Sequence, residues 1–172
     1  MKRLALLAMV LTAAPVAADT AHQHSPYAGQ ESRDIKALSP NEIADLEAGR
    51  GMGLALAAEL NGYPGPRHVL DLAQELRLSA EQRRRTSELF EAMRKETSAL
   101  GMQVIEAERT LDRLFAEKQA TPQSIAAATQ AAGMAKGALR AAHLRYHLAM
   151  MEVLTAEQVA AYGHLRGYST HH

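Results

Sequence analysis

Apolar and small residues recur at alternating steps of three and four along two long stretches of the chain. In the first stretch, about residues 80–117, these positions are Phe90, Met93, Thr97, Leu100, Val104, Ala107, Leu111 and Leu114. In the second, which opens at Thr121-Pro122, they are Ile125, Ala128, Ala132, Ala135, Leu139, Ala142, Tyr146, Ala149 and Val153. This spacing is typical of helices that pack along a shared seam. Because only residues 118–120 separate the two stretches, we predict an antiparallel helical hairpin about 57 Å long.

Shorter helices are predicted before and after this hairpin. Ser39-Pro40-Asn41-Glu42 provides a cap, a proline and an acid for a helix start. We expect that helix to continue to about Leu60, with Gly49, Gly51 and Gly53 marking a bend or a close helix approach, and to bury Ile43, Leu46, Leu54, Leu56 and Leu60.

Residues 61–66 break the pattern, and helices follow at about 67–76 and 156–165. No stretch alternates as a strand does. The predicted fold class is therefore all-α, a bent antiparallel helical hairpin with short flanking helices.

Two near-identical pentapeptides bracket the predicted hairpin. They read Leu78-Ser79-Ala80-Glu81-Gln82 and Leu154-Thr155-Ala156-Glu157-Gln158. In each, the hydroxyl can accept a hydrogen bond from the first helical turn, and the glutamine can reach back to the N–H of the cap residue. The glutamate lies where the positive end of the helix dipole favours negative charge. Both pentapeptides therefore predict the start of a helix.

The N-terminal residues resemble a secretory signal. Lys2 and Arg3 precede an apolar run over residues 4–16, and Val16-Ala17-Ala18 offers small residues for cleavage. We predict a signal peptide at residues 1–18, either cleaved or kept as an anchor, and export to a bacterial periplasm. Residues 19–38 are polar and form the expected flexible arm, residues 39–168 the helical domain, and residues 169–172 a tail.

Composition narrows the function of the mature protein. The 172 residues contain 19 Lys and Arg, two of them in the predicted signal, against 19 Asp and Glu, so the mature chain is slightly acidic and unsuited to nucleic acid. Cysteine is absent, which excludes disulfides, thiolate metal sites and a thiol nucleophile. No convergent catalytic set is visible on the predicted helices. We therefore expect a protein that is not an enzyme and requires no cofactor.

Histidine and methionine give the chain one candidate metal site. His143, His147 and Met151 follow one another at four-residue steps, which places them near one face of a helix. Two imidazoles and a thioether can bind Cu(I), or Zn(II) or Ni(II) when oxygen ligands are added. His68, Glu59 or the same residues of a second chain would complete the site. Alternatively, the two histidines flank the seam as polar neighbours of a helix contact.

The paired motifs give the chain a family resemblance. Leu78, Ser79 and Gln82, with Leu154, Thr155 and Gln158, bracket a long hairpin in an exported chain without cysteine, and in this the sequence resembles the Spy/CpxP family. The resemblance covers about residues 39–168. The first motif has serine where that family usually has threonine, which keeps the hydroxyl cap. Residues 50–69 look like a distinct branch of the family.

This resemblance implies a curved homodimer that holds unfolded proteins without ATP. The expected function is a periplasmic chaperone or envelope-stress adaptor whose partners are unfolded or envelope proteins and a membrane sensor. The expected client contacts on the long helix are Arg83, Arg84, Met93, Arg94 and Met102. Metal-sensing relatives suggest the alternative of a Cu, Zn or Ni sensor or buffer with His and Met ligands. A purely structural adaptor is the third hypothesis.

Overall fold

A computed structural model describes residues 25–168 of the chain. It divides into two units, Met1–Glu31 and Ser32–His172. The described part of the first unit consists of turns, such as the one closed by the 2.9 Å bond from the N–H of Ala28 to the carbonyl of Ser25, leading to the short 3-10 helix η1 (Gln30–Ser32). The predicted signal peptide, the start of the arm and the tail at 169–172 lie outside the described residues.

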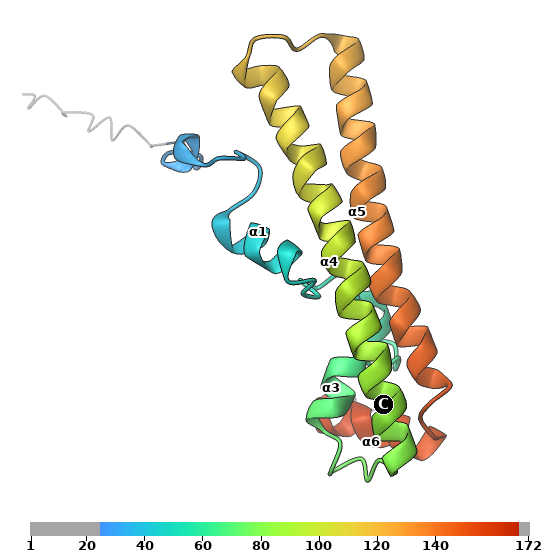
Figure 1. Cartoon of the computed structure of the whole chain (residues 1–172). Coiled ribbons are helices and arrows are strands. Elements are labelled where there is room, and N and C mark those ends of the chain that lie inside the picture. The colour runs from blue at the N-terminus through green and yellow to red at the C-terminus, as the bar shows by residue number, and fades with distance from the viewer. Residues whose placement is uncertain (1–24, 169–172) are drawn as a thin grey trace, which may run out of the picture. The chain divides into compact units, whose positions relative to one another are not determined.

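The second unit is built on the predicted hairpin. Helices α4 (Ala80–Ala116) and α5 (Pro122–Met151) run antiparallel along their whole length (Figure 1). Every regular element between residues 25 and 168 is helical, so the all-α prediction is confirmed. The seam is also confirmed, since Thr97 and Val104 of α4 and Ala132, Leu139 and Ala142 of α5 are buried. Small alanines on α5 let the two helices approach closely.

The N-terminal part of this unit packs against the hairpin. Helix α1 (Pro40–Glu47) begins with a capping box between Ser39 and Glu42 and contacts α4. Its core cluster with the hairpin consists of Ile35, Leu38, Leu46, Val104, Ile105 and Leu139. Ile35 is fully buried, so the end of the predicted flexible arm is part of the packed domain.

The helix predicted from residue 40 is interrupted at the glycines, as expected, but the predicted burial of Leu56 and Leu60 is wrong. Helix α1 ends at Glu47, and a loop containing Gly49, Met52 and Gly53 at positive φ leads to the short helix α2 (Leu56–Glu59). The loop changes the helical phase, so Leu56 and Leu60 are 55% and 58% exposed instead of buried.

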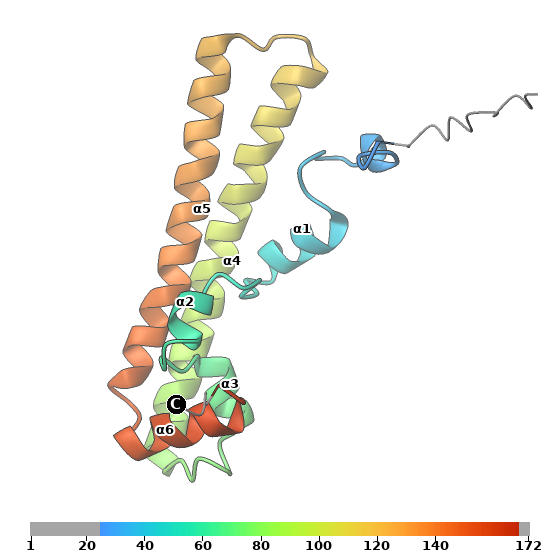
Figure 2. The ribbon, with the colours of Figure 1, turned by 180° about the vertical axis from the view of Figure 1, so that it is seen from behind.

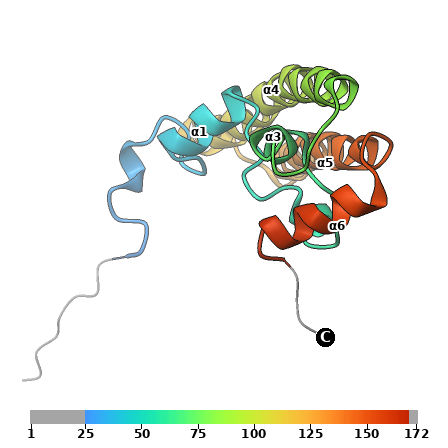
Figure 3. The ribbon, with the colours of Figure 1, turned by 90° about the horizontal axis from the view of Figure 1, so that it is seen from below.

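Three short helices gather around the base of the hairpin. Helix α2 lies beside the hairpin (Figure 2), and α3 (Pro66–Asp71) contacts both α4 and α5. Helix α6 (Ala156–Leu165) lies beside α5 at this end of the hairpin (Figure 3). A second core cluster joins α3 and α6 to the end of α5 and comprises Val69, Ala73, Leu76, Leu78, Met150, Val153, Leu154 and Tyr162. The predicted bounds of α6 are confirmed, whereas α3 is shorter than predicted.

The two pentapeptides meet at this base. Both form the predicted capping boxes, at Ser79 and at Thr155. In addition, Gln82 Nε2 donates to Gln158 Oε1 at 2.7 Å, and Gln158 Nε2 donates to Gln82 Oε1 at 3.1 Å. Each amide also donates to a backbone carbonyl just before the opposite motif. Gln82 Nε2 donates to the carbonyl of Val153 at 2.9 Å, and Gln158 Nε2 donates to that of Leu76 at 3.1 Å. The motifs therefore start two helices and fasten them to each other.

None of the helices in the described range combines the length and the apolar character needed to cross a bilayer.

The close approach of α1 to α4 gives a test of the packing. A Cβ at Gly101 would lie 2.2 Å from the carbonyl oxygen of Leu46, whereas a Cβ at Gly133 of α5 would meet nothing within 4 Å. We expect Gly101→Ala to lower the free energy of unfolding by about 1–3 kcal/mol, because backbone must move to admit the methyl group. Gly133→Ala is the matched control and should raise it by about 0.5–1 kcal/mol through helix propensity. Urea unfolding measures both, and equal shifts would contradict the packing described.

Candidate functional site

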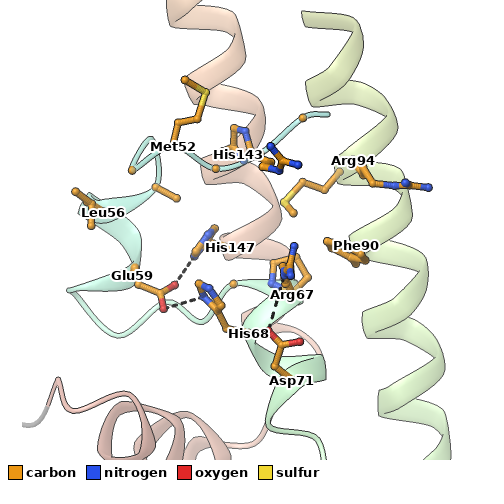
Figure 4. A pocket seen from close by; sticks show the side chains of 18 of the residues that line it. Met52, Leu56, Glu59, Arg67, His68, Asp71, Phe90, Arg94, His143 and His147 are labelled. Atoms are coloured by element: carbon orange, nitrogen blue, oxygen red, sulfur yellow. Dashed lines mark ion pairs between the residues drawn. The ribbon is translucent and has the colours of Figure 1, made fainter. Parts of the chain in front are cut away.

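A cavity of about 940 Å³ lies between the hairpin and the short elements at its base. It is lined by the loop at residues 48–55, by α2 and α3, by one face each of α4 and α5, and by Arg166 and Tyr168 after α6. Figure 4 shows its titratable side chains: Glu59 from α2, His68 from α3, and His143 and His147 on the side of α5 that faces the cavity. Segments far apart in the sequence therefore meet here.

Glu59 is the buried charge at the centre of this arrangement. Its residue is 6% exposed, and its Oε1 accepts a short hydrogen bond from the hydroxyl of Tyr162 and another, at 3.2 Å, from that of Tyr168. His68 Nδ1 lies 3.3 Å and Arg166 Nε 3.5 Å from the same oxygen. A buried carboxylate needs such partners to remain ionised.

These contacts fix the ionisation of the Glu59 carboxyl. Burial acts to raise its pKa, but hydrogen bonds from His68 and Tyr162 and the positive charges of His68 and His147 outweigh burial and lower the pKa to about 2. Burial raises the pKa of Tyr162, and the hydrogen bond to Glu59 raises it further, so the phenol keeps its proton. Glu59 is therefore an anion that accepts hydrogen bonds at neutral pH.

The second carboxylate oxygen of Glu59, unlike the first, accepts no hydrogen bond from the described residues. Oε2 is buried and has no hydrogen-bond partner among the described residues, while His147 Nδ1 lies 3.7 Å from it. His147 Nδ1 instead pairs at 2.7 Å with the carbonyl oxygen of Tyr63. Because a carbonyl only accepts, Nδ1 carries a proton, and Nε2 is the ring nitrogen that can present a lone pair to the cavity.

Gly65 provides space beside these two groups. A Cβ at this position would lie 2.8 Å from Cε1 and 3.1 Å from Nε2 of His147, and 3.4 Å from Glu59 Oε2. Any larger residue would fill the space next to the imidazole. The loop before α3 therefore needs glycine here for the ring and the carboxylate to keep their positions.

His143 adds a second imidazole one turn away on α5. It is 2% exposed, and its Nε2 has no hydrogen-bond partner among the described residues. Burial lowers the pKa of His143, and the nearby charge of His147 lowers it further. A neutral imidazole with a free nitrogen is the form that binds a metal ion.

Two thioethers also line the cavity. Met93 of α4 is 8% exposed, and Met52 lies in the loop between α1 and α2 with φ at 46°. A bulky residue at positive φ costs on the order of 1–3 kcal/mol of strain. Met52 lies at the edge of the cavity (Figure 4).

The structure brings together most of the predicted metal ligands. His143, His147, His68 and Glu59 all line the cavity, whereas Met151 does not and is exposed. Within residues 25–168, no three His, Asp or Glu side chains already converge as a metal-binding group. The cavity therefore gathers a donor set in one place, and an ion would require side-chain rotation to be held.

The five residues predicted to contact client proteins do not all lie on one exposed surface. Met102 is 50% exposed, and Arg83 is exposed as well. Arg84 pairs with Glu81 and Glu88 on the helix surface, whereas Arg94 pairs with Glu91 where both line the cavity. Met93, by contrast, is buried against the cavity and contributes nothing to an exposed surface.

Comparison with known proteins places the chain in a family. Residues 51–161 match the family model described as heavy-metal resistance. The chain belongs to the heavy-metal resistance family. This family is related to the Spy/CpxP-like helical proteins that the paired motifs resemble. Neither the curated proteins nor the solved structures contain a significant match.

The span matched to the heavy-metal resistance family includes most of the cavity. Glu59, His68, His143 and His147 lie inside it, and it ends one residue before Tyr162. Sequence reasoning identified the two α5 histidines from their spacing but missed Tyr162, Arg166 and Tyr168. No local pattern in the sequence marks these three residues as partners of Glu59.

The lowered pKa of Glu59 makes stability depend on pH. The carboxyl group has a pKa of about 2 in the folded protein against an ordinary value of 4.5, so its contribution is complete above about pH 4.5 and is lost as the pH falls towards 2. We expect Glu59→Gln to be less stable than the wild type at neutral pH and the difference to shrink on acidification. Urea unfolding at several pH values measures it, and a difference independent of pH would contradict the assignment.

Proposed function

We propose that this member of the heavy-metal resistance family binds a heavy-metal ion in the cavity at the base of its hairpin. The observation that carries the proposal is the pair of buried atoms without hydrogen-bond partners among the described residues, Glu59 Oε2 and His143 Nε2, in one cavity. Buried polar atoms of this kind require a partner, and a cation satisfies both a carboxylate oxygen and an imidazole nitrogen.

The chemistry of the donor set favours borderline or soft cations. Glu59 supplies negative charge, His143 and His147 supply imidazole nitrogens, and Met52 also lines the cavity with its thioether. Imidazole and carboxylate ligands suit Zn(II) and Ni(II), and thioethers suit Cu(I). Gly65 leaves space next to His147 Nε2 and Glu59 Oε2, as a site between these groups requires.

We further propose that the protein acts as an exported sensor or buffer of such ions in the periplasm. The N-terminal sequence supports export, and the absence of cysteine suits an oxidising compartment in which thiolate ligands would be lost. A sensor in this compartment would pass its signal to a membrane partner.

The first test is calorimetry of the tag-free protein with Zn(II), Ni(II) and Cu(I). We expect binding of one ion per chain, and an affinity at least about tenfold lower in the variant His143→Ala with His147→Ala because two ligands are lost. His164→Ala is the matched control, since His164 is an exposed histidine of α6 that does not line the cavity. Unchanged binding in the double variant would show that the cavity is not the site.

A second candidate function is the chaperone activity suggested by the Spy/CpxP resemblance. The supporting observation is the set of large apolar side chains left exposed along the hairpin: Met102, Phe115, Met134 and Leu148. Exposed apolar surface between charged residues suits binding of unfolded proteins or a second copy of the chain, as in a homodimer.

This second function predicts suppression of aggregation without nucleotide. The protein should keep a reductively unfolded model protein in solution at near-equal molar amounts. Replacing Met102 and Met134 with serine should weaken this effect several-fold, because apolar contact area is lost. Light scattering measures it. Serine variants that suppress aggregation as well as the wild type would exclude this surface.

A further inference from the structure

The contacts of Glu59 are divided between its two oxygens. Oε1 carries every hydrogen bond and short ion pair of the carboxylate, to Tyr162, Tyr168, His68 and Arg166. Oε2 has no hydrogen bond among the described residues and lies beside His147. Oε1 therefore connects Glu59 to the surrounding fold, whereas Oε2 is available to bind an ion in the cavity.

Three of the four groups on Oε1 come from the C-terminal segment, residues 162–168. Tyr162 belongs to α6 and is almost fully buried. Arg166 donates to the hydroxyl of Tyr168 from Nε at 3.2 Å and from a terminal nitrogen at 2.9 Å, and its guanidinium lies 5.5 Å from the centroid of the same ring. The pair approaches Glu59 as a single polar unit.

We infer that the C-terminal segment positions Glu59 for the ion, and that ion binding and docking of this segment strengthen each other. The inference rests on the proposed function. A ligating carboxylate is commonly oriented by hydrogen bonds to its other oxygen, and loss of such bonds lowers metal affinity about 10–100-fold. Linkage requires the converse, so an ion held by Glu59 and the α5 histidines must stabilise the docked segment.

Through this coupling, ion binding at the site would change the mobility of the C-terminal segment. Helix α6 lies beside α5 at the base of the hairpin (Figure 3), and its last turn and the residues after it contact the cavity through Glu59. The exposed side chains of the segment, such as those of His164 and Leu165, would then change in mobility with occupancy of the site. Tyr162, Arg166 and Tyr168 are positioning residues in this scheme, since none of them contacts the ion.

The test combines Zn(II) calorimetry with hydrogen exchange of the full chain. We expect Tyr162→Phe and, separately, Tyr168→Phe to lower Zn(II) affinity about tenfold or more. Tyr146→Phe is the matched control, because the hydroxyl of Tyr146 donates to Glu96 at 2.9 Å, a carboxylate that does not line the cavity. Tyr168 is less buried than Tyr162, so Tyr168→Phe is the variant less apt to disturb folding. Circular dichroism checks that each variant is folded.

Hydrogen exchange distinguishes this coupling from a purely structural role of Tyr162 and Tyr168, because only the coupling makes exchange in the segment depend on Zn(II). Zn(II) should slow amide exchange in residues 156–168 of the wild type and of Tyr146→Phe, and this slowing should be reduced in the two positioning variants. Zn(II) binding with unchanged exchange in this segment, or with equal affinity in folded Tyr162→Phe and Tyr168→Phe, would overturn the coupling alone. A wild type that binds no Zn(II), Ni(II) or Cu(I) would overturn the proposed function and the coupling with it.

Discussion

The arrangement at the base of the hairpin depends on one buried negative charge. Removing a carboxylate from water is unfavourable unless hydrogen bonds and opposite charges replace its hydration. For Glu59, these groups come from α3, α5 and the C-terminal segment, which must all reach the end of α2. The requirement explains why these four elements meet around one cavity.

The paired glutamines create the frame in which these elements can meet. Gln82 and Gln158 satisfy each other's amides while capping α4 and α6, so the start of the first long helix is fixed against the start of the last short one. Neither residue lines the cavity. Their effect on the site is indirect, because they set the position from which Tyr162 reaches Glu59. The two pentapeptide motifs thus have a structural role, whereas the residues proposed to bind an ion lie in the cavity.

Features determined by local sequence were predictable. The seam follows from the steps of three and four, and the caps at Ser79 and Thr155 follow from residues three apart. The spacing of His143 and His147 also placed both on one face. It failed for Met151, because eight residues turn a helix by about 80° from its starting direction, which takes the thioether away from the cavity.

Features that depend on distant contacts were not predictable. Gly49, Met52 and Gly53 adopt positive φ because the loop must return to the hairpin, and the periodicity of the preceding helix therefore gave the wrong burial for Leu56 and Leu60. Likewise, Tyr162 and Tyr168 contact a carboxylate more than a hundred residues earlier in the chain. Membership of the heavy-metal resistance family supports a role with metal ions, and the geometry around Glu59 suggests where an ion would be held.

The most direct test is the protonation of the two α5 imidazoles, measured by long-range proton–nitrogen NMR with and without Zn(II). In the metal-free protein, Nδ1 of His147 should carry a proton, which the Tyr63 carbonyl accepts. Nε2 of His147 and Nε2 of His143 should shift together as one equivalent of Zn(II) is added. A neutral His147 ring with its proton on Nε2, or histidine nitrogen signals that do not move at saturating Zn(II), would show that these imidazoles do not hold the ion.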